Sequence, residues 1–306
     1  MSLFNLPMEI LLEITDHLDD AAMNALASTN SQVCNFLNQF LYQRDVVRLQ
    51  SISLTFGAEH GLQGTIQQAI NAGRHFTPIP ESFHIALQVA ADRGHVRLVK
   101  LLLQVDGIDV NFRGGPLEIA PLGLAARRGR SAIVKLLLDR EGIEVNRQDD
   151  SGWTALCRAV HCNHLEAAKL LLERDDIDVN LPQESGWTAL YLACHNGCQP
   201  LVGLLLERDD IDPNPRDDSG CTPLSHICRC SCGSVAIVRL LLSHPGIDPI
   251  AVDNYGVSIL AQFRYRRNPF NNMLNSFSHL RDNEMLSLVI AAQRPVIAQR
   301  PKPKNR

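Results

Sequence analysis

The feature that most constrains this chain is an internal repeat with a period of about 34 residues. The two clearest copies are SGWTALCRAVHCNHLEAAKLLLERDDIDVN at 151–180 and SGWTALYLACHNGCQPLVGLLLERDDIDPN at 185–214. One leucine recurs in register through the chain, at Leu54, Leu87, Leu122, Leu156, Leu190, Leu224 and Leu260. A unit this short cannot bury its apolar face alone, so the period predicts stacked units that share one continuous core.

Each copy predicts a helix, a tight turn, a second helix and an extended loop. A threonine is placed to cap the first helix, and alanine or proline follows at the first helical position, in Thr154–Ala155, Thr188–Ala189 and Thr222–Pro223. Glycine then breaks the chain, because it tolerates a left-handed turn, at Gly94, Gly129 and Gly197. The second helix carries three consecutive leucines, as at 101–103 and 170–172. The predicted fold class is therefore all-α.

Composition limits the environment and the partners of the chain. Aromatic residues make up only 5% of it, so a core of Leu, Ile, Val and Ala is expected. The net charge of −4 does not favour nucleic acid or an anionic membrane as a partner. We find no apolar run of about 18 residues, and the N-terminus carries acids in its apolar stretch, so neither a membrane span nor a secretion signal is expected. The nine cysteines are then expected to stay reduced inside the cell, in the cytoplasm, the nucleus or both.

The repeat resembles the ankyrin repeat, whose TPLHxAA, xxGH, LLL and DVN segments are matched in this order in several copies. The usual ending is replaced by D-x-I-D-V-N, which is one residue longer and explains a period of 34. The resemblance implies a solenoid over 46–292, with about six to seven repeats joined by β-hairpin-like finger loops. The first copy is weak, and the last carries an insertion at 264–282. The basic tail at 293–306 is expected to be disordered; a nuclear-import role for it is the alternative.

The segment before the array, 1–45, does not follow the repeat. Its apolar residues at helical spacing and its candidate caps predict three short helices. So small a module has little core of its own, and part of its apolar surface is expected to meet a partner.

LPMEILLEITDHL at 6–18 resembles the opening of an F-box, the module that docks substrate receptors on the Skp-type adaptor of cullin–RING ubiquitin ligases. The resemblance implies that five residues face this adaptor: Leu6, Pro7, Ile10, Leu11 and Leu26. The tryptophan common near the end of an F-box is absent, and Leu41–Tyr42 stands there. A plain helical cap for the stack is the alternative. An F-box followed by this type of array resembles ankyrin proteins of filamentous fungi.

No catalytic motif stands out. The sequence lacks GxxxxGK[ST], HExxH and GxSxG, so we expect no enzyme and no cofactor. Cys228, Cys230 and Cys232 carry ligand types that zinc prefers. However, Cys228 occupies the slot of Ala91 and Ala126, which predicts a buried thiol rather than a metal ligand.

The two resemblances together imply a substrate-recognition subunit of a cullin–RING ligase, which would hold a client protein close to the ubiquitin-loaded enzyme. A non-ligase ankyrin scaffold is the alternative. In ankyrin-like stacks the residue before the capping threonine faces the binding groove, so the resemblance implies that Trp153 and Trp187 stand side by side on the client surface. The alternative is that each indole only stiffens the array. The pairs before the turn glycines are expected to line the same groove: Asp92 and Arg93, Arg127 and Arg128, His161 and Cys162, and His195 and Asn196.

Overall fold

The computed structural model describes residues 52–73, 79, 81–114, 118–229, 234–261 and 278–298. Within these residues every regular element is a helix, apart from an isolated antiparallel bridge between Val252 and Ser258. The predicted N-terminal module, with its adaptor-facing residues Leu6, Pro7, Ile10, Leu11 and Leu26, lies outside the described residues, as does most of the insertion at 264–282.

The chain divides into two compact units. The first comprises residues 1–125 and 139–143, and the second comprises 126–138 and 144–306. The first contains helices α4 (Ile52–His60), α5 (Gln63–Gly73), α6 (Glu81–Arg93) and α7 (Val96–Leu102), together with most of α8 (Pro121–Arg127). Helix α6 packs against both α4 and α7.

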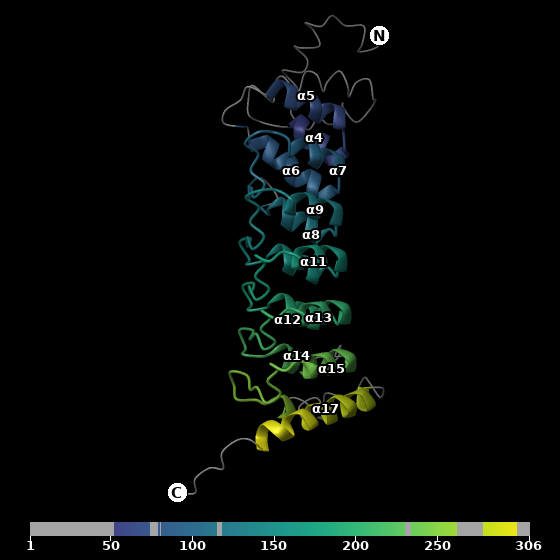
Figure 1. Cartoon of the computed structure of the whole chain (residues 1–306), viewed down its shortest axis with the longest axis vertical. Helices are drawn as coiled ribbons and strands as arrows, with labels where there is room; N and C mark the ends of the chain where they lie inside the picture. Colours follow the sequence, from purple (N-terminus) through teal and green to yellow (C-terminus); the bar gives the residue numbers. More distant parts are fainter. Residues whose placement is uncertain are drawn as a thin grey trace, which may run out of the picture. The chain divides into compact units, whose positions relative to one another are not determined.

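The second unit contains α9 (Ser131–Leu138), α10 (Ala155–His161), α11 (Leu165–Leu172), α12 (Ala189–His195), α13 (Gln199–Leu206), α14 (Pro223–Arg229), α15 (Val235–Ser243) and α17 (Ser278–Ala298). First helices pack on first helices, α10 on α12 and α12 on α14. Second helices form a parallel row from α9 through α11 and α13 to α15. The labelled helices α11, α13 and α15 follow one another in chain order in Figure 1. This is the stacking that the period predicted.

The helix boundaries fall where local chemistry places them. The hydroxyl oxygen of Thr154 accepts the Cys157 N–H at 3.1 Å, and Thr188 caps α12 in the same way. Helix α14 starts at Pro223, where the missing N–H costs no helical hydrogen bond. The turn glycines adopt positive φ, including 90° at Gly94 and 70° at Gly197. These predictions of caps and turns are confirmed.

The extended loops form hairpin-like turns that we call fingers, defined as 149–153, 183–187, 217–221 and 253–257. In each finger the first residue donates its N–H to the carbonyl of the last, as from Asp149 to Trp153 at 3.1 Å. Neighbouring fingers are also joined, since Glu184 N–H donates to Ser151 and Asp218 N–H donates to Ser185. Gly152 has a φ of 76°, and a Cβ there would lie 2.9 Å from the Cα of Gln183. Glycine in SGWT therefore allows the fingers to approach closely.

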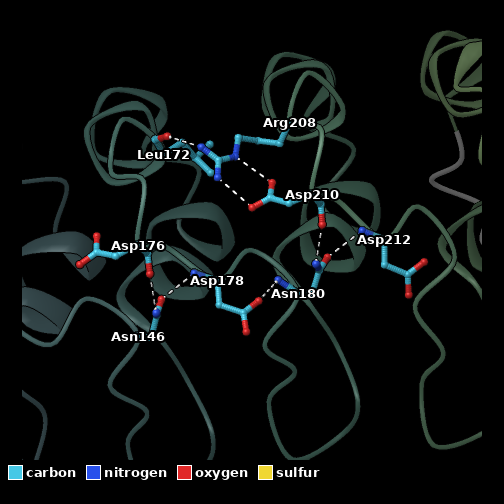
Figure 2. A network of polar contacts seen from close by, with 8 residues as sticks. All are labelled: Asn146, Leu172, Asp176, Asp178, Asn180, Arg208, Asp210 and Asp212. Carbon is cyan, nitrogen blue, oxygen red and sulfur yellow. Dashed lines mark hydrogen bonds and ion pairs between the residues drawn. The ribbon is translucent and has the colours of Figure 1, made fainter.

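The D-x-I-D-V-N ending ties each repeat to the next one (Figure 2). The side chain of Asn180 donates to the carbonyl of Asp210 at 2.7 Å and accepts the Asp212 N–H at 2.8 Å. Asn146 makes the same two bonds to Asp176 and Asp178. Two guanidinium nitrogens of Arg208 donate to the carboxylate of Asp210, and the third donates to the carbonyl of Leu172 in the preceding repeat. The longer ending thus provides a side-chain ladder between repeats.

One predicted boundary is wrong. Helix α17 continues to Ala298, so residues 293–298 are helical and do not belong to a disordered tail. The buried Gln293 donates from its amide to the carbonyl of Pro249 at 2.6 Å, which fixes this part of the helix to the preceding repeat. The prediction of disorder was made from the basic composition of the tail, which gives no indication of this contact.

Candidate functional site

Trp153 lies at the base of its finger, above the first helix of its own repeat. Its ring meets that of His161 edge to face, with centroids 5.0 Å apart. The guanidinium of Arg158 lies 5.7 Å from the indole centroid and forms a largely buried ion pair with Asp149, in the same finger. The other Asp149 oxygen accepts the N–H groups of Ser151 and Trp153. The finger and the helix therefore fix the half-buried indole between them.

Trp187 occupies the same position one repeat later and has a richer aromatic environment. It stacks on Tyr191 at a centroid distance of 4.9 Å and contacts His195 at 4.7 Å. His226, from the next repeat, meets Trp187, Tyr191 and His195. Nδ1 of His195 and Nε2 of His226 are 2.9 Å apart. The indole itself remains half-buried.

Burial controls the protonation of the groups beneath Trp187. The Tyr191 hydroxyl donates to Asp217 at 2.7 Å, and burial, followed by this carboxylate, raises the pKa of the phenol. Burial, followed by the neighbouring His195 and Arg229, lowers the pKa of His226 to about 4, whereas Asp217 opposes the shift. A neutral His226 can form a hydrogen bond with His195, because a hydrogen bond between two imidazole rings needs one nitrogen that donates and one that accepts.

The structure brings together only some of the predicted client residues. Trp153 meets His161, and Trp187 meets His195. Asn196 is exposed, but its amide donates to the carbonyl of His161 at 2.8 Å, which links two successive turns.

Asp92 does not lie on the surface as predicted. It is only 8% exposed, because it falls on the inner side of α6 among the buried residues of that helix. Its neighbour Arg93 is exposed and forms an ion pair with Glu59. Of the remaining residues, Arg128 is exposed, and Arg127 and Cys162 are half-buried.

Sequence reasoning missed the residues that hold the two indoles in place. Tyr191 lies four residues after Trp187, and His195 lies four residues after Tyr191. This spacing places Tyr191 and His195 on one face of α12, next to the indole that precedes the helix. That spacing was the available signal for Tyr191. No local pattern indicates His226, Asp217 or Arg158, because their contacts depend on the stacking of repeats or on the fold of a finger.

Four of the described cysteines occupy buried positions like those of small apolar residues. Cys157, Cys194, Cys221 and Cys228 are buried, as predicted for Cys228, and burial raises the pKa of the Cys157 and Cys194 thiols. Within the described ranges no group of three or more His, Cys, Asp or Glu side chains is placed to hold a metal ion. Cys230 and Cys232 are not among the described residues. No described helix is long and apolar enough to cross a membrane.

Comparison with solved structures finds the same fold. An ankyrin repeat domain from Acinetobacter baumannii is 23% identical with a TM-score of 0.57, and the match covers 68% of this chain and 97% of that one. The ankyrin repeat domain of Bcl-3, a member of the IkappaB family, is 27% identical with a TM-score of 0.54, and the match covers 69% and 85% of the two chains. No curated protein matches the sequence.

The family comparison agrees with the geometry. The model of the family described as "Ankyrin repeats (3 copies)" matches residues 57–149, 84–183 and 176–253. Arrays of this kind are protein–protein interaction domains, in which stacked repeats present a continuous surface to a partner. The helix pairs, the linked fingers and these matches together show that the chain belongs to the ankyrin repeat family.

Proposed function

We propose that this protein is the substrate-recognition subunit of a cullin–RING ubiquitin ligase. Its ankyrin array binds a client protein, and its N-terminal F-box-like module docks on the Skp-type adaptor. The protein performs no bond chemistry itself and acts by holding the client close to the loaded ubiquitin-conjugating enzyme. The support for the adaptor contact is the sequence LPMEILLEITDHL at 6–18.

The observation that carries the client-binding part is the pair of half-buried indoles of Trp153 and Trp187. Both indoles pack against aromatic side chains, and Trp153 also lies under the Arg158 guanidinium, yet neither indole is fully covered. Rigid, partly exposed tryptophans contribute large contact area to a partner at low cost in side-chain entropy and are among the most frequent hot-spot residues. The fold does not require tryptophan in this slot, because the next repeat carries the fully buried Cys221 there.

Two pairs of substitutions test the adaptor contact and the client contact separately. A full-length chain with Leu6→Ala and Pro7→Ala is expected to lose the adaptor and to retain clients, which can then be trapped and identified. Adding Trp153→Ala and Trp187→Ala is expected to weaken client binding at least about 30-fold, which corresponds to about 2 kcal/mol. A trapped client that binds the tryptophan variant as tightly as the parent would return both indoles to a purely structural role.

A scaffold without ligase activity is the second candidate, and the same ankyrin surface supports it equally. The scaffold differs from the ligase subunit in the role of the N-terminal segment, which would only cap the stack of repeats. Retention of client binding by a chain that never binds a Skp-type adaptor would favour the scaffold.

A further inference from the structure

Three successive fingers each carry an acidic residue at the same position, and two of these fingers also carry the indoles. Residue Asp150 in the first finger, Glu184 in the second and Asp218 in the third occupy the same position, three residues before Trp153, Trp187 and Cys221, respectively. All three side chains are exposed. The backbone bonds that join neighbouring fingers place these three residues in a row, one per repeat, in the same fingers that carry Trp153, Trp187 and Cys221.

Three arginines near this row in the sequence have partners within the array. Arg158 pairs with the buried Asp149, and Arg147 pairs with Glu144. Arg216 donates to the carbonyls of Gly220 and Val252. Residues 144–218 contain 15 Asp and Glu against 6 Lys and Arg, whereas the whole chain has 33 against 29. The acidic excess of the protein is therefore concentrated in the repeats that carry the tryptophans.

A surface that combines indoles with exposed carboxylates favours a cationic partner for two reasons. The ring face attracts a guanidinium or ammonium group, as Arg158 already shows at 5.7 Å from Trp153. The carboxylate then pairs with the same cation or with the next one along the chain. An acidic partner would instead be repelled by the row of carboxylates.

We propose that the surface of Trp153 and Trp187, with the finger-tip acids Asp150, Glu184 and Asp218, binds an extended, arginine- or lysine-rich segment of the partner protein. This inference rests on the proposed function, since it names the chemistry of the client. Stacked helices lie about 8–10 Å apart. A chain in the extended polyproline II conformation advances about 3.1 Å per residue and has three residues per turn. A basic side chain at every third residue therefore stays on one face of such a chain and matches one repeat per contact.

The probe is a 12-residue peptide with arginine at every third position and serine and threonine between, added to the full-length protein. Because Trp153 and Trp187 are the only tryptophans in the chain, intrinsic tryptophan emission reports directly on this surface. We expect the peptide to change this emission and to bind more weakly as salt rises. A peptide with glutamate in place of arginine should not bind, and one with its four arginines adjacent should bind at least about threefold more weakly.

Matched variants test the role of the finger tips. Asp150→Asn, Glu184→Gln and Asp218→Asn together should weaken peptide binding at least about tenfold. Glu173→Gln, Asp175→Asn and Glu207→Gln remove the same charge from exposed carboxylates of the loops after the second helices and should change binding less than about twofold. Glu184→Lys alone leaves the backbone bonds between fingers in place. It should weaken binding even if the triple variant proves unstable.

Several results would overturn the proposal: equal binding of the acidic peptide, equal weakening by both triple variants, or unchanged tryptophan emission on binding. A peptide that binds only after residues 299–306 are removed would assign the surface to the chain's own basic tail and also overturn it. If a trapped client depends on both tryptophans but not on the finger tips, this inference fails and the client-binding role stands.

Discussion

Asn180 provides the sharpest test of how the repeats are held together. Its amide makes two hydrogen bonds to the next repeat, one to the carbonyl of Asp210 at 2.7 Å and one from the N–H of Asp212 at 2.8 Å. Asn180→Ala removes both at once and leaves a carbonyl and an N–H without their partner (Figure 2). A typical intramolecular hydrogen bond contributes about 1 kcal/mol, so the full loss is about 2 kcal/mol. Since Asp210 and Asp212 are exposed and water can replace part of the loss, we expect about 1–2 kcal/mol.

The assay combines urea denaturation with amide hydrogen exchange. The unfolding midpoint should fall, and the Asp212 N–H should lose protection, because its acceptor is gone. Asn180→Asp keeps that acceptor but places a carboxylate against the Asp210 carbonyl, so protection at Asp212 should survive while overall stability falls. Gln199→Ala, at an exposed amide at the start of α13, is the control and should change stability by less than about 0.5 kcal/mol. Unchanged stability together with a protected Asp212 amide in Asn180→Ala would refute the role of the ladder.

Two further predictions concern the core and pH. Leu171 and Leu205 are completely buried, so truncation of either to alanine should cost about 2–5 kcal/mol in urea denaturation. Limited proteolysis should then cut the adjacent repeats first, because the stability of a repeat array is close to the sum of the stabilities of its repeats and of the interfaces between neighbours. A uniform loss of protection against the protease along the array would indicate one globular core instead. Burial lowers the pKa of His226 to about 4 from its usual 6.5. The neutral ring therefore contributes its full stability to the folded state above pH 6.5. This contribution, on the order of 3 kcal/mol, is lost as the pH falls from 6.5 through 4. His226→Leu, which copies Leu192 of the preceding repeat, should flatten this dependence, and an unchanged pH profile would contradict the assignment to His226.

The periodic part of the fold was predictable because each repeat contains its own signals. The capping threonines, the turn glycines and the buried leucines depend on chemistry within about 30 residues, and Thr154, Gly94 and Leu171 all behave as the pattern indicates. The end of the array was less predictable. The end of helix α17 contacts the preceding repeat through the hydrogen bond between Gln293 and Pro249, which no local signal reveals.

The candidate surface was predictable only where side chains follow the repeat. Trp153 and Trp187 could be placed from their position before the capping threonine, and their partners His161 and His195 from the turn. His226 and Asp217 reach the site from the next repeat, so the sequence position of either alone carries no signal. Asp92 was misplaced because a position near the end of a helix does not by itself say which face it occupies.

The most direct test of the proposed function is the affinity of the full-length protein for a purified Skp-type adaptor, measured by isothermal titration calorimetry. The account predicts one-to-one binding that Leu6→Ala with Pro7→Ala abolishes and that Trp153→Ala with Trp187→Ala leaves unchanged, because a few apolar side chains dominate such a contact. A wild-type chain that does not bind the adaptor, or a Leu6 and Pro7 variant that binds it normally, would contradict the account.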